Sequence, residues 1–112
     1  MSVARRLAVT IAAALLLALS VAVAADARSR WATVRPYNAK LNRIAYCEST
    51  GRWHLNTGNG FYGGLQFTLG TWWSVGGRGM PHFASVLEQK YRAVKVFKRR
   101  GNWGDWPVCG YR

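Results

Sequence analysis

The chain has 112 residues and a formal net charge of +12, from 16 Lys and Arg against only four Asp and Glu. This length is enough for one small domain and no more, which excludes a large multidomain enzyme. The charge predicts a salt-sensitive attraction to polyanions, but it does not choose between nucleic acid, cell-wall polymers and lipid headgroups.

Residues 1–27 have the order of a secretory signal peptide. Two arginines precede an uncharged run over residues 7–25, and small residues then offer cleavage after Ala24, Ala25 or Ala27. An uncleaved membrane anchor stays open, because the run approaches the roughly 17–25 residues that a spanning helix needs. Loss of the two arginines still leaves a charge of about +10. Export favours anionic wall polymers over nucleic acid as partners.

The segment after the signal is polar and basic, lacks periodicity and ends at Pro36, so residues 28–36 are expected to be a basic linker. A helix is expected over residues 37–48 and begins the folded domain, residues 37–112. The glycine-rich stretch 49–67 predicts an irregular loop with at most a short hairpin, since it contains a tight-turn Asn-Gly pair.

Two further helices complete the expected fold. Thr68 is suited to cap a short helix over residues 69–75. The last helix is expected from near Ser85 to Gly101, with Ser85 and Glu88 forming a capping box. The fold class is therefore a small, mostly α (α+β) domain with a glycine-rich loop or short hairpin lobe.

Two cysteines, Cys47 and Cys109, are expected to form a disulfide in an oxidising compartment. The bridge closes a loop of about 60 residues, which is worth roughly 4 kcal/mol in the chain-entropy model. A zinc site with His54 and His82 is the alternative. Zinc sites normally contain short ligand pairs that this sequence lacks, so no metal or other cofactor is expected.

Glu48 is the candidate catalytic acid. It continues the apolar stripe of Leu41 and Ile44 at the end of the expected helix. Burial and the negative end of the helix dipole both disfavour its carboxylate, so its pKa should be raised. An acid that stays protonated can donate to the leaving oxygen of a glycosidic bond. The alternatives are an exposed helix-end glutamate or one paired with Arg52.

The other acids offer one candidate for a second carboxylate. Glu88 is occupied in the capping box and Asp26 lies at the signal cleavage site. Asp105 remains, with a turn-stabilising role as the alternative. Without a second carboxylate, cleavage needs a substrate hydroxyl or a positioned water as the attacking group. Trp72 and Trp73 are adjacent on a helix, so one should be buried and the other nearer the surface.

The run over residues 47–67, CESTGRWHLNTGNGFYGGLQF, resembles the catalytic domain of the resuscitation-promoting factors. The ending Trp106-Pro107-Val108-Cys109 resembles it too, and the similarity covers residues 37–109. The resemblance implies a fold related to c-type lysozyme and the soluble lytic transglycosylases. It also implies secretion, a Cys47–Cys109 bridge, and cleavage of the β-1,4 bond between N-acetylmuramic acid and N-acetylglucosamine.

The resemblance also implies roles for single residues. It places the single catalytic glutamate of the family on Glu48. Gln66 and Thr71 match residues of the glycan cleft, while Asn59 and Tyr62 fall in the cleft-forming loop. Trp72 is a further candidate for substrate binding.

The chain departs from the family pattern near its end. The segment 90–100 is strongly basic where the family is richer in acids, Asn102 is a one-residue insertion, and Asp105 replaces a small residue. We expect these departures to affect the end of the glycan cleft that lies away from Glu48, and not the catalytic end. The basic surface is a candidate for binding the wall.

The sequence therefore predicts a secreted, wall-associated, monomeric lytic transglycosylase, linked by its resemblance to the resuscitation of dormant bacteria. Glu48 would protonate the glycosidic oxygen and then act as base for the 6-hydroxyl of muramic acid; a hydrolase would use water instead. Glycan strands, anionic wall polymers and other wall hydrolases are the candidate partners. A non-catalytic cationic glycan-binding or signalling module and a membrane-active antimicrobial protein are the alternatives.

Overall fold

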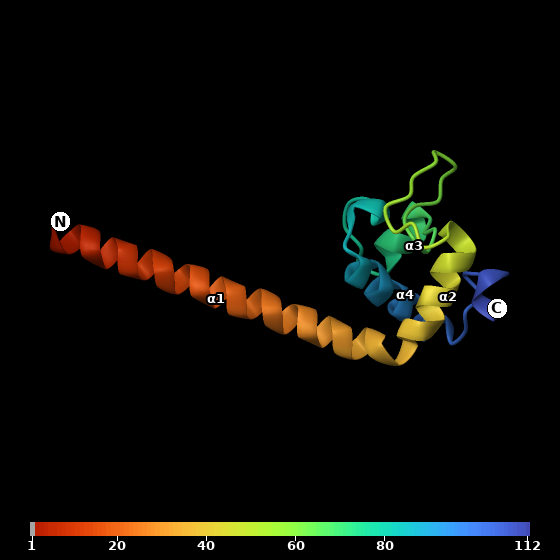
Figure 1. Ribbon diagram of the computed structural model, residues 1–112, viewed down its shortest axis with the longest axis horizontal. Coiled ribbons are helices and arrows are strands. Elements are labelled where there is room, and N and C mark those ends of the chain that lie inside the picture. Colours follow the sequence, from red (N-terminus) through yellow and green to blue (C-terminus); the bar gives the residue numbers. More distant parts are fainter. Residues whose placement is uncertain (1) are drawn as a thin grey trace.

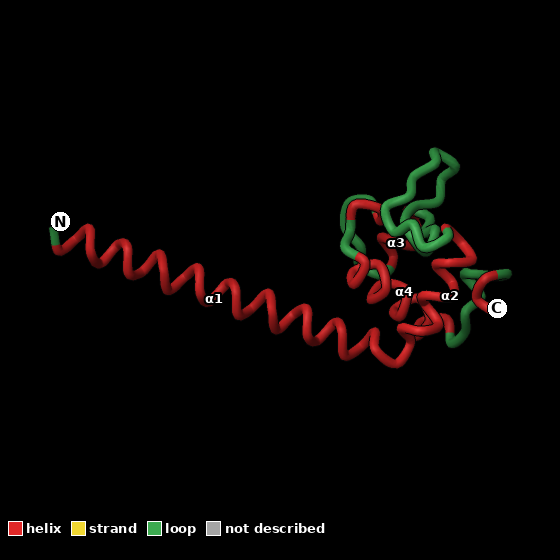
Figure 2. Tube along the Cα trace, in the orientation of Figure 1, coloured by secondary structure: helices red, strands yellow, loops and turns green. Residues whose placement is uncertain are grey.

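Helices supply all the regular secondary structure of residues 2–112, the part of the chain that the computed structural model describes. Figures 1 and 2 show one long helix projecting from a small helical domain, with loops joining the domain's short helices. In chain order the segments are α1 (Val3–Val34), the 3₁₀ turn η1 (Arg35–Tyr37), α2 (Asn38–Ser49), α3 (Leu69–Ser74), η2 (Pro81–Phe83), α4 (Val86–Arg100) and η3 (Cys109–Tyr111).

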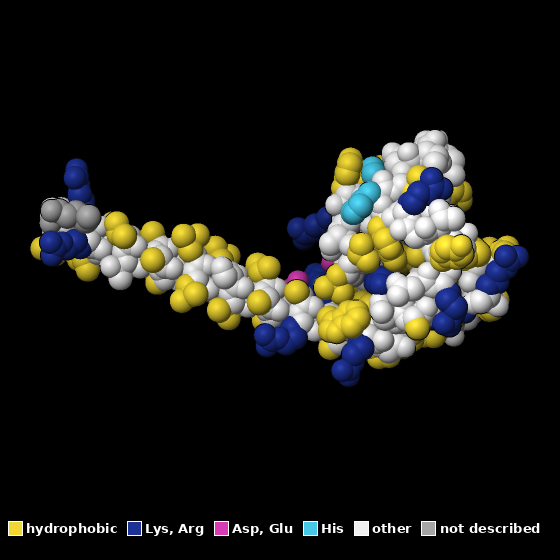
Figure 3. All heavy atoms as spheres, in the orientation of Figure 1, with side chains coloured by type: hydrophobic (Ala, Val, Ile, Leu, Met, Phe, Trp, Pro, Cys, Tyr) yellow, Lys and Arg dark blue, Asp and Glu magenta, His cyan; other side chains and the backbone are white. Residues whose placement is uncertain are grey.

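Helix α1 runs through the expected signal peptide and into the expected linker. Its apolar side chains are exposed along the projecting part (Figure 3), and by length and apolarity this helix meets the requirements of a membrane span. A signal sequence has the same properties, so that assignment stays a prediction. The expectation of an irregular linker over 28–36 is wrong, because residues 28–34 are helical and Val34 is fully buried.

The core lies between α2, α4 and the loops that cover them. Helix α2 buries Leu41, Ile44 and Ala45, which recur at the spacing of one helical face, as predicted. Helix α4 faces them with Ala93, Val94 and Val96. The end of α1, helix α3 and the loops complete the core with these side chains: Val34, Trp72, Leu65, Phe67 and Trp106. Each large side chain buried in this way contributes roughly 1.5–3 kcal/mol.

One buried amide connects α4 to both ends of the glycine-rich loop. Gln89 has no exposed surface, and its Nε2 donates to the carbonyl oxygens of Trp53 at 2.8 Å and Ala84 at 3.1 Å. Its Oε1 accepts from the Gly64 N–H at 3.0 Å. Three backbone groups that the fold removes from water are thereby satisfied by one side chain.

The glycine-rich loop reaches α4 only because two of its residues lack a side chain. Gly63 has a φ of +79°, and a Cβ there would collide with Gln89. A Cβ on Gly64 would collide with the Trp53 ring. The loop contains two isolated antiparallel bridges, between residues 56 and 62 and between 62 and 67, so the short hairpin lobe is not present as a pair of strands.

The disulfide between Cys47 and Cys109 is present, with 5.6 Å between the two Cα atoms. It joins the last turn of α2 to η3 across a sequence separation of 62 residues. The zinc alternative is excluded, since both sulfur atoms are used in the bridge. The bond holds the C-terminal segment beside the end of α2, where Glu48 lies.

We predict that Gln89→Met lowers the free energy of unfolding by about 2–4 kcal/mol, because it leaves buried N–H and C=O groups without partners. Denaturant unfolding followed by circular dichroism measures the loss. Lys98→Met, at an exposed position of the same helix, is the control and should change stability by about 0.5 kcal/mol or less. Equal losses in the two variants would contradict the role given to the amide.

Candidate active site

Glu48 lies on the last turn of α2 and lines a cavity of about 300 Å³. The helix ends because the next residue but one, Thr50, takes a left-handed conformation with a φ of 55°. The glycine-rich loop and the C-terminal segment supply the rest of the wall. The lining residues are Glu48, Phe61, Gln66, Asp105, Trp106, Pro107, Val108 and Cys109.

A buried hydroxyl next to Glu48 fixes the end of the helix. Ser49 is 2% exposed, and its Oγ lies 3.0 Å from the Ala45 carbonyl oxygen and 2.9 Å from that of Gly64. The same oxygen accepts from the Arg52 N–H at 3.1 Å. These contacts tie the turn that carries Glu48 directly to the glycine-rich loop.

The carboxylate of Glu48 has no hydrogen bond or ion pair to any residue in the range 2–112, although the domain is rich in cations. The predicted alternative partner, Arg52, instead donates its Nε to the Ser49 carbonyl at 2.9 Å. The other three acids are each paired: Asp26 with Arg30, Glu88 with Arg30 and Arg92, and Asp105 with Arg100. Glu48 is the exception.

Partial burial raises the pKa of Glu48, because loss of solvent disfavours the charged carboxylate. Among residues 2–112, no charged neighbour contributes to the shift of this pKa. This agrees in direction with the raised pKa expected from the sequence and suits a group that donates a proton.

Gln66 also lines this cavity and holds an unusual backbone conformation. Its φ is 53°, a left-handed value that is uncommon for a residue with a side chain. Its Nε2 donates to the Gly63 carbonyl oxygen at 2.8 Å, which stabilises the turn. Such strain is often found at functional sites, where the surrounding structure enforces it.

A smaller cavity of about 50 Å³ adjoins the first and extends the site. Thr71 lines it and is fixed by Thr68, whose Oγ1 accepts from the Thr71 N–H at 3.2 Å. Both cavities share four lining residues, Phe61, Gln66, Asp105 and Trp106, and therefore form one cleft. The structure brings Glu48, Gln66 and Thr71 to this one cleft, and their roles in binding or cleaving glycan stay a prediction.

Asp105 lies at the junction of the two cavities. Its side chain is only 11% exposed, and Oδ1 accepts a hydrogen bond from Arg100. A second carboxylate is therefore present in the cleft, as the sequence left open, but it is paired where Glu48 is not.

Three predicted substrate-binding residues do not line the cleft. Asn59 accepts the Phe61 N–H at 3.1 Å and shapes the loop, while Tyr62 stacks on His82 with 5.6 Å between ring centroids. Trp72 is 1% exposed and belongs to the core, so its prediction as a sugar contact is corrected. A buried ring has no face free for a sugar, and its neighbour Trp73 is the exposed one of the pair.

Two aromatic residues in the wall were not predicted as site residues. Phe61 is 45% exposed and is placed by the Asn59 hydrogen bond. Trp106 is buried, and its indole N–H donates to the Leu65 carbonyl at 2.7 Å, which positions the C-terminal wall. Trp106 could have been recognised from the sequence, because it belongs to the Trp-Pro-Val-Cys ending. No local signal separates Phe61 from the other aromatics, since its role depends on where the loop folds.

Comparison with known proteins identifies the domain. Residues 35–109 match the family profile of the transglycosylase-like domain. The chain is 46% identical over 108 residues to resuscitation-promoting factor Rpf of Micrococcus luteus, covering 96% of this chain and 46% of that protein. It is 50% identical over 76 residues to RpfE of Mycobacterium tuberculosis, covering 68% of this chain and 44% of that protein.

A third relative, RpfD of Mycobacterium tuberculosis, is 52% identical over 66 residues, which cover 59% of this chain and 42% of that protein. The chain thus spans just under half the length of the relatives it matches. The matched region contains the helix that carries Glu48, the glycine-rich loop, and the C-terminal segment as far as Cys109. This chain belongs to the resuscitation-promoting factor family, and its residues 35–109 are a transglycosylase-like domain.

Proposed function

We propose that the protein is a secreted peptidoglycan-cleaving enzyme, a lytic transglycosylase that acts on the β-1,4 bond between N-acetylmuramic acid and N-acetylglucosamine. The observation that carries the proposal is the unpaired, half-buried Glu48 in a cleft of the transglycosylase-like domain. Its raised pKa keeps a proton available for donation.

In the proposed reaction, Glu48 donates its proton to the glycosidic oxygen as the bond to muramic acid C1 breaks. The resulting carboxylate then takes the proton of the muramic acid 6-hydroxyl, whose oxygen attacks C1. The products are a free N-acetylglucosamine 4-hydroxyl and a 1,6-anhydromuramic acid end. One acid performs both steps, so no second catalytic carboxylate is needed.

The substrate contacts in the proposal follow the cleft. Gln66 and Thr71 line its two cavities and would bind the glycan on either side of the cleaved bond. Asn59 and Tyr62 act by shaping the loop that forms one wall. Phe61 offers an exposed ring for stacking on a sugar face. The helical architecture and the disulfide support a lysozyme-like fold for this arrangement.

Secretion, processing and partners belong to the same proposal. Residues 1–27 serve as the signal peptide, with cleavage after Ala24, Ala25 or Ala27. Because Val34 is buried and Arg30 pairs with Glu88, the mature domain begins close to residue 28 and has no flexible linker.

The monomer binds glycan strands, and its activity promotes the resuscitation of dormant cells. Anionic wall polymers and other wall hydrolases are its further partners.

We predict that Glu48→Gln lowers peptidoglycan cleavage by about 10²–10⁴-fold, because general acid–base catalysis contributes that much. Mass spectrometry of digested wall should find anhydromuramic ends, one water lighter than hydrolytic ends, with the native protein only. Asn42→Gln, exposed on the same helix, is the control. Cleavage by a folded Glu48→Gln protein at the native rate would favour a non-catalytic glycan-binding module. Hydrolytic ends would favour a muramidase.

The raised pKa of Glu48 also predicts a pH-dependent stability. Between the ordinary glutamate pKa of about 4.3 and the raised value, the folded state binds more protons than the unfolded state, so stability falls as pH rises through this window. Glu48→Gln removes this loss. We therefore expect the free energy of unfolding of the variant, relative to that of the native protein, to be higher at about pH 7 than at about pH 3.5. Denaturant unfolding at the two pH values measures this difference. A difference that is the same at both pH values would mean that Glu48 is not desolvated.

Asp105 is proposed to position the glycan and not to react. Asp105→Ala should raise KM for soluble glycan strands about tenfold, the size of one charge-assisted hydrogen bond, and leave kcat within about threefold. Arg100→Ala is the matched control, because it breaks the same ion pair and keeps the carboxylate. An equal rise in KM in both variants would assign the effect to the ion pair. A fall in kcat of a hundredfold or more would make Asp105 a second catalytic carboxylate.

A further inference from the structure

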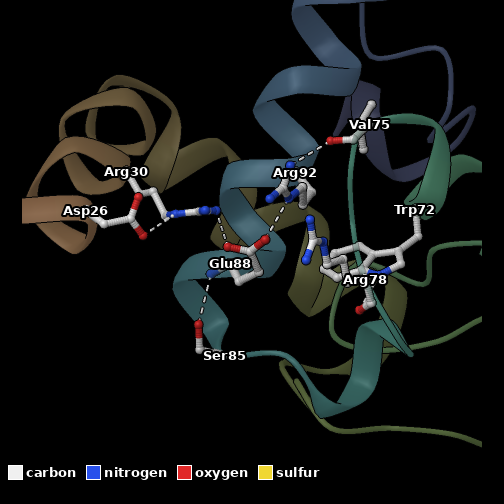
Figure 4. Close-up of polar contacts among 8 residues, drawn as sticks. All are labelled: Asp26, Arg30, Trp72, Val75, Arg78, Ser85, Glu88 and Arg92. Atoms are coloured by element: carbon white, nitrogen blue, oxygen red, sulfur yellow. Dashed lines mark hydrogen bonds and ion pairs between the residues drawn. The ribbon is translucent and has the colours of Figure 1, made fainter. Parts of the chain in front are cut away.

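A separate cavity of about 530 Å³ shares no lining residue with the two cavities that form the Glu48 cleft. It opens where the end of α1 meets the first turns of α4 and the loop that follows α3 (Figure 4). Its lining is Arg30, Trp72, Gly76, Arg78, Ala84, Glu88 and Arg92. Three guanidinium groups from three different segments thus surround one carboxylate.

The single carboxylate is already fully used. Glu88 accepts from Arg30 through Oε2 and from Arg92 Nε through Oε1, the latter at 2.6 Å. Arg92 also donates its Nη1 to the Val75 carbonyl at 2.7 Å. A Cβ on Gly76 would lie 2.8 Å from that nitrogen, so the glycine makes room for the guanidinium. Arg30 and Arg92 are therefore held in place before any ligand binds.

Arg78 is different, because its guanidinium makes no hydrogen bond or ion pair to any of residues 2–112. Its backbone is fixed, since its carbonyl oxygen accepts the Trp72 indole N–H at 3.2 Å. In Figure 4 the side chain reaches toward Arg92 from the opposite wall of the cavity. A free guanidinium on an anchored backbone, beside two fixed ones, is suited to bind an oxyanion in bidentate fashion.

The Tyr91 ring connects two cations of the cavity to a third one beyond it. Arg30 lies 4.5 Å and Arg92 5.2 Å from the ring centroid, and Lys95, which is outside the cavity lining, lies 5.1 Å from it. One turn further along α4, Arg99 donates its Nη1 to the Ser74 hydroxyl at 2.9 Å. The positive charge is therefore a strip that begins at the cavity, which fits an extended polyanion better than a single small anion.

We propose that this cavity binds a phosphate group of an anionic phosphodiester polymer of the cell wall, with Arg78 as its principal donor. The cation strip of Arg30, Arg92, Lys95 and Arg99 lies along neighbouring phosphates. The inference rests on the proposed function for the location of the protein in the wall. Binding at this cavity retains the enzyme on the wall while the Glu48 cleft stays free for glycan.

The test measures binding of delipidated poly(glycerol phosphate) to the full domain by calorimetry at about 0.15 M salt. Arg78→Ala should weaken binding about tenfold, the loss of one charge-assisted hydrogen-bonded contact. Arg78→Lys keeps the charge but not the planar fork, and should weaken binding nearly as much. Arg43→Ala removes one exposed arginine on α2 and should change binding by less than twofold.

Equal losses in Arg78→Ala and Arg43→Ala would overturn the proposal, since they would mean attraction by net charge alone. Two further results would also overturn it: tighter binding to polyglutamate of matched length, and tighter binding to anionic lipid vesicles. Cleavage of polymer-free peptidoglycan separates this inference from the proposed function. If the native protein cleaves and Arg78→Ala binds the polymer normally, only the inference fails; if the native protein does not cleave, the proposed function fails.

Discussion

The arrangement of the whole domain depends on the three hydrogen bonds of the Gln89 side chain. This buried amide connects α4 to Trp53 at the start of the glycine-rich loop and to Gly64 at its end. Gly64 in turn accepts from the Ser49 hydroxyl, one residue after Glu48. The catalytic candidate, the loop that faces it and the helix behind them are therefore linked by a short chain of buried hydrogen bonds. Unsatisfied buried polar groups are costly, so these bonds specify one loop position and with it one cleft.

The electrostatics of the domain set Glu48 apart. In a chain with 16 basic residues, a carboxylate would be expected to find a cation. Three of the four acids do, whereas Glu48 lines a cavity with Phe61, Trp106 and the disulfide, and the Gln66 amide in the same wall donates to the Gly63 carbonyl. No Lys or Arg of residues 2–112 lines this cavity, and desolvation raises the pKa of Glu48. One strip of positive charge follows the outer side of α4 from the Arg78 cavity, which shares no lining residue with the Glu48 cleft.

Helix α4 serves both regions through its two faces. Its inner face buries Ala93, Val94 and Val96 and carries Gln89, which positions the cleft. Its outer face carries Arg92 and Lys95. The basic segment 90–100 keeps an apolar core face, because its buried apolar positions have the helical spacing. The ion pair between Arg100 and Asp105 links this segment to the cleft, which Asp105 lines.

The sequence by itself determined the helices over residues 38–49, 69–74 and 86–100 and the stripe that buries Leu41 and Ile44, because periodicity and capping are local properties. It also determined the Cys47–Cys109 pair, because the chain has only two cysteines. The catalytic role of Glu48 stays a prediction. The sequence failed for residues 28–36, where burial of Val34 makes a polar segment helical, and for Trp72, whose exposure depends on which neighbours cover it. Only the tertiary structure decided that Glu48 has no cation partner among residues 2–112, that Phe61 and Asp105 line the same cavities as Gln66, and that three arginines from separate segments share one cavity. These facts depend on contacts between residues distant in sequence, which no local pattern encodes.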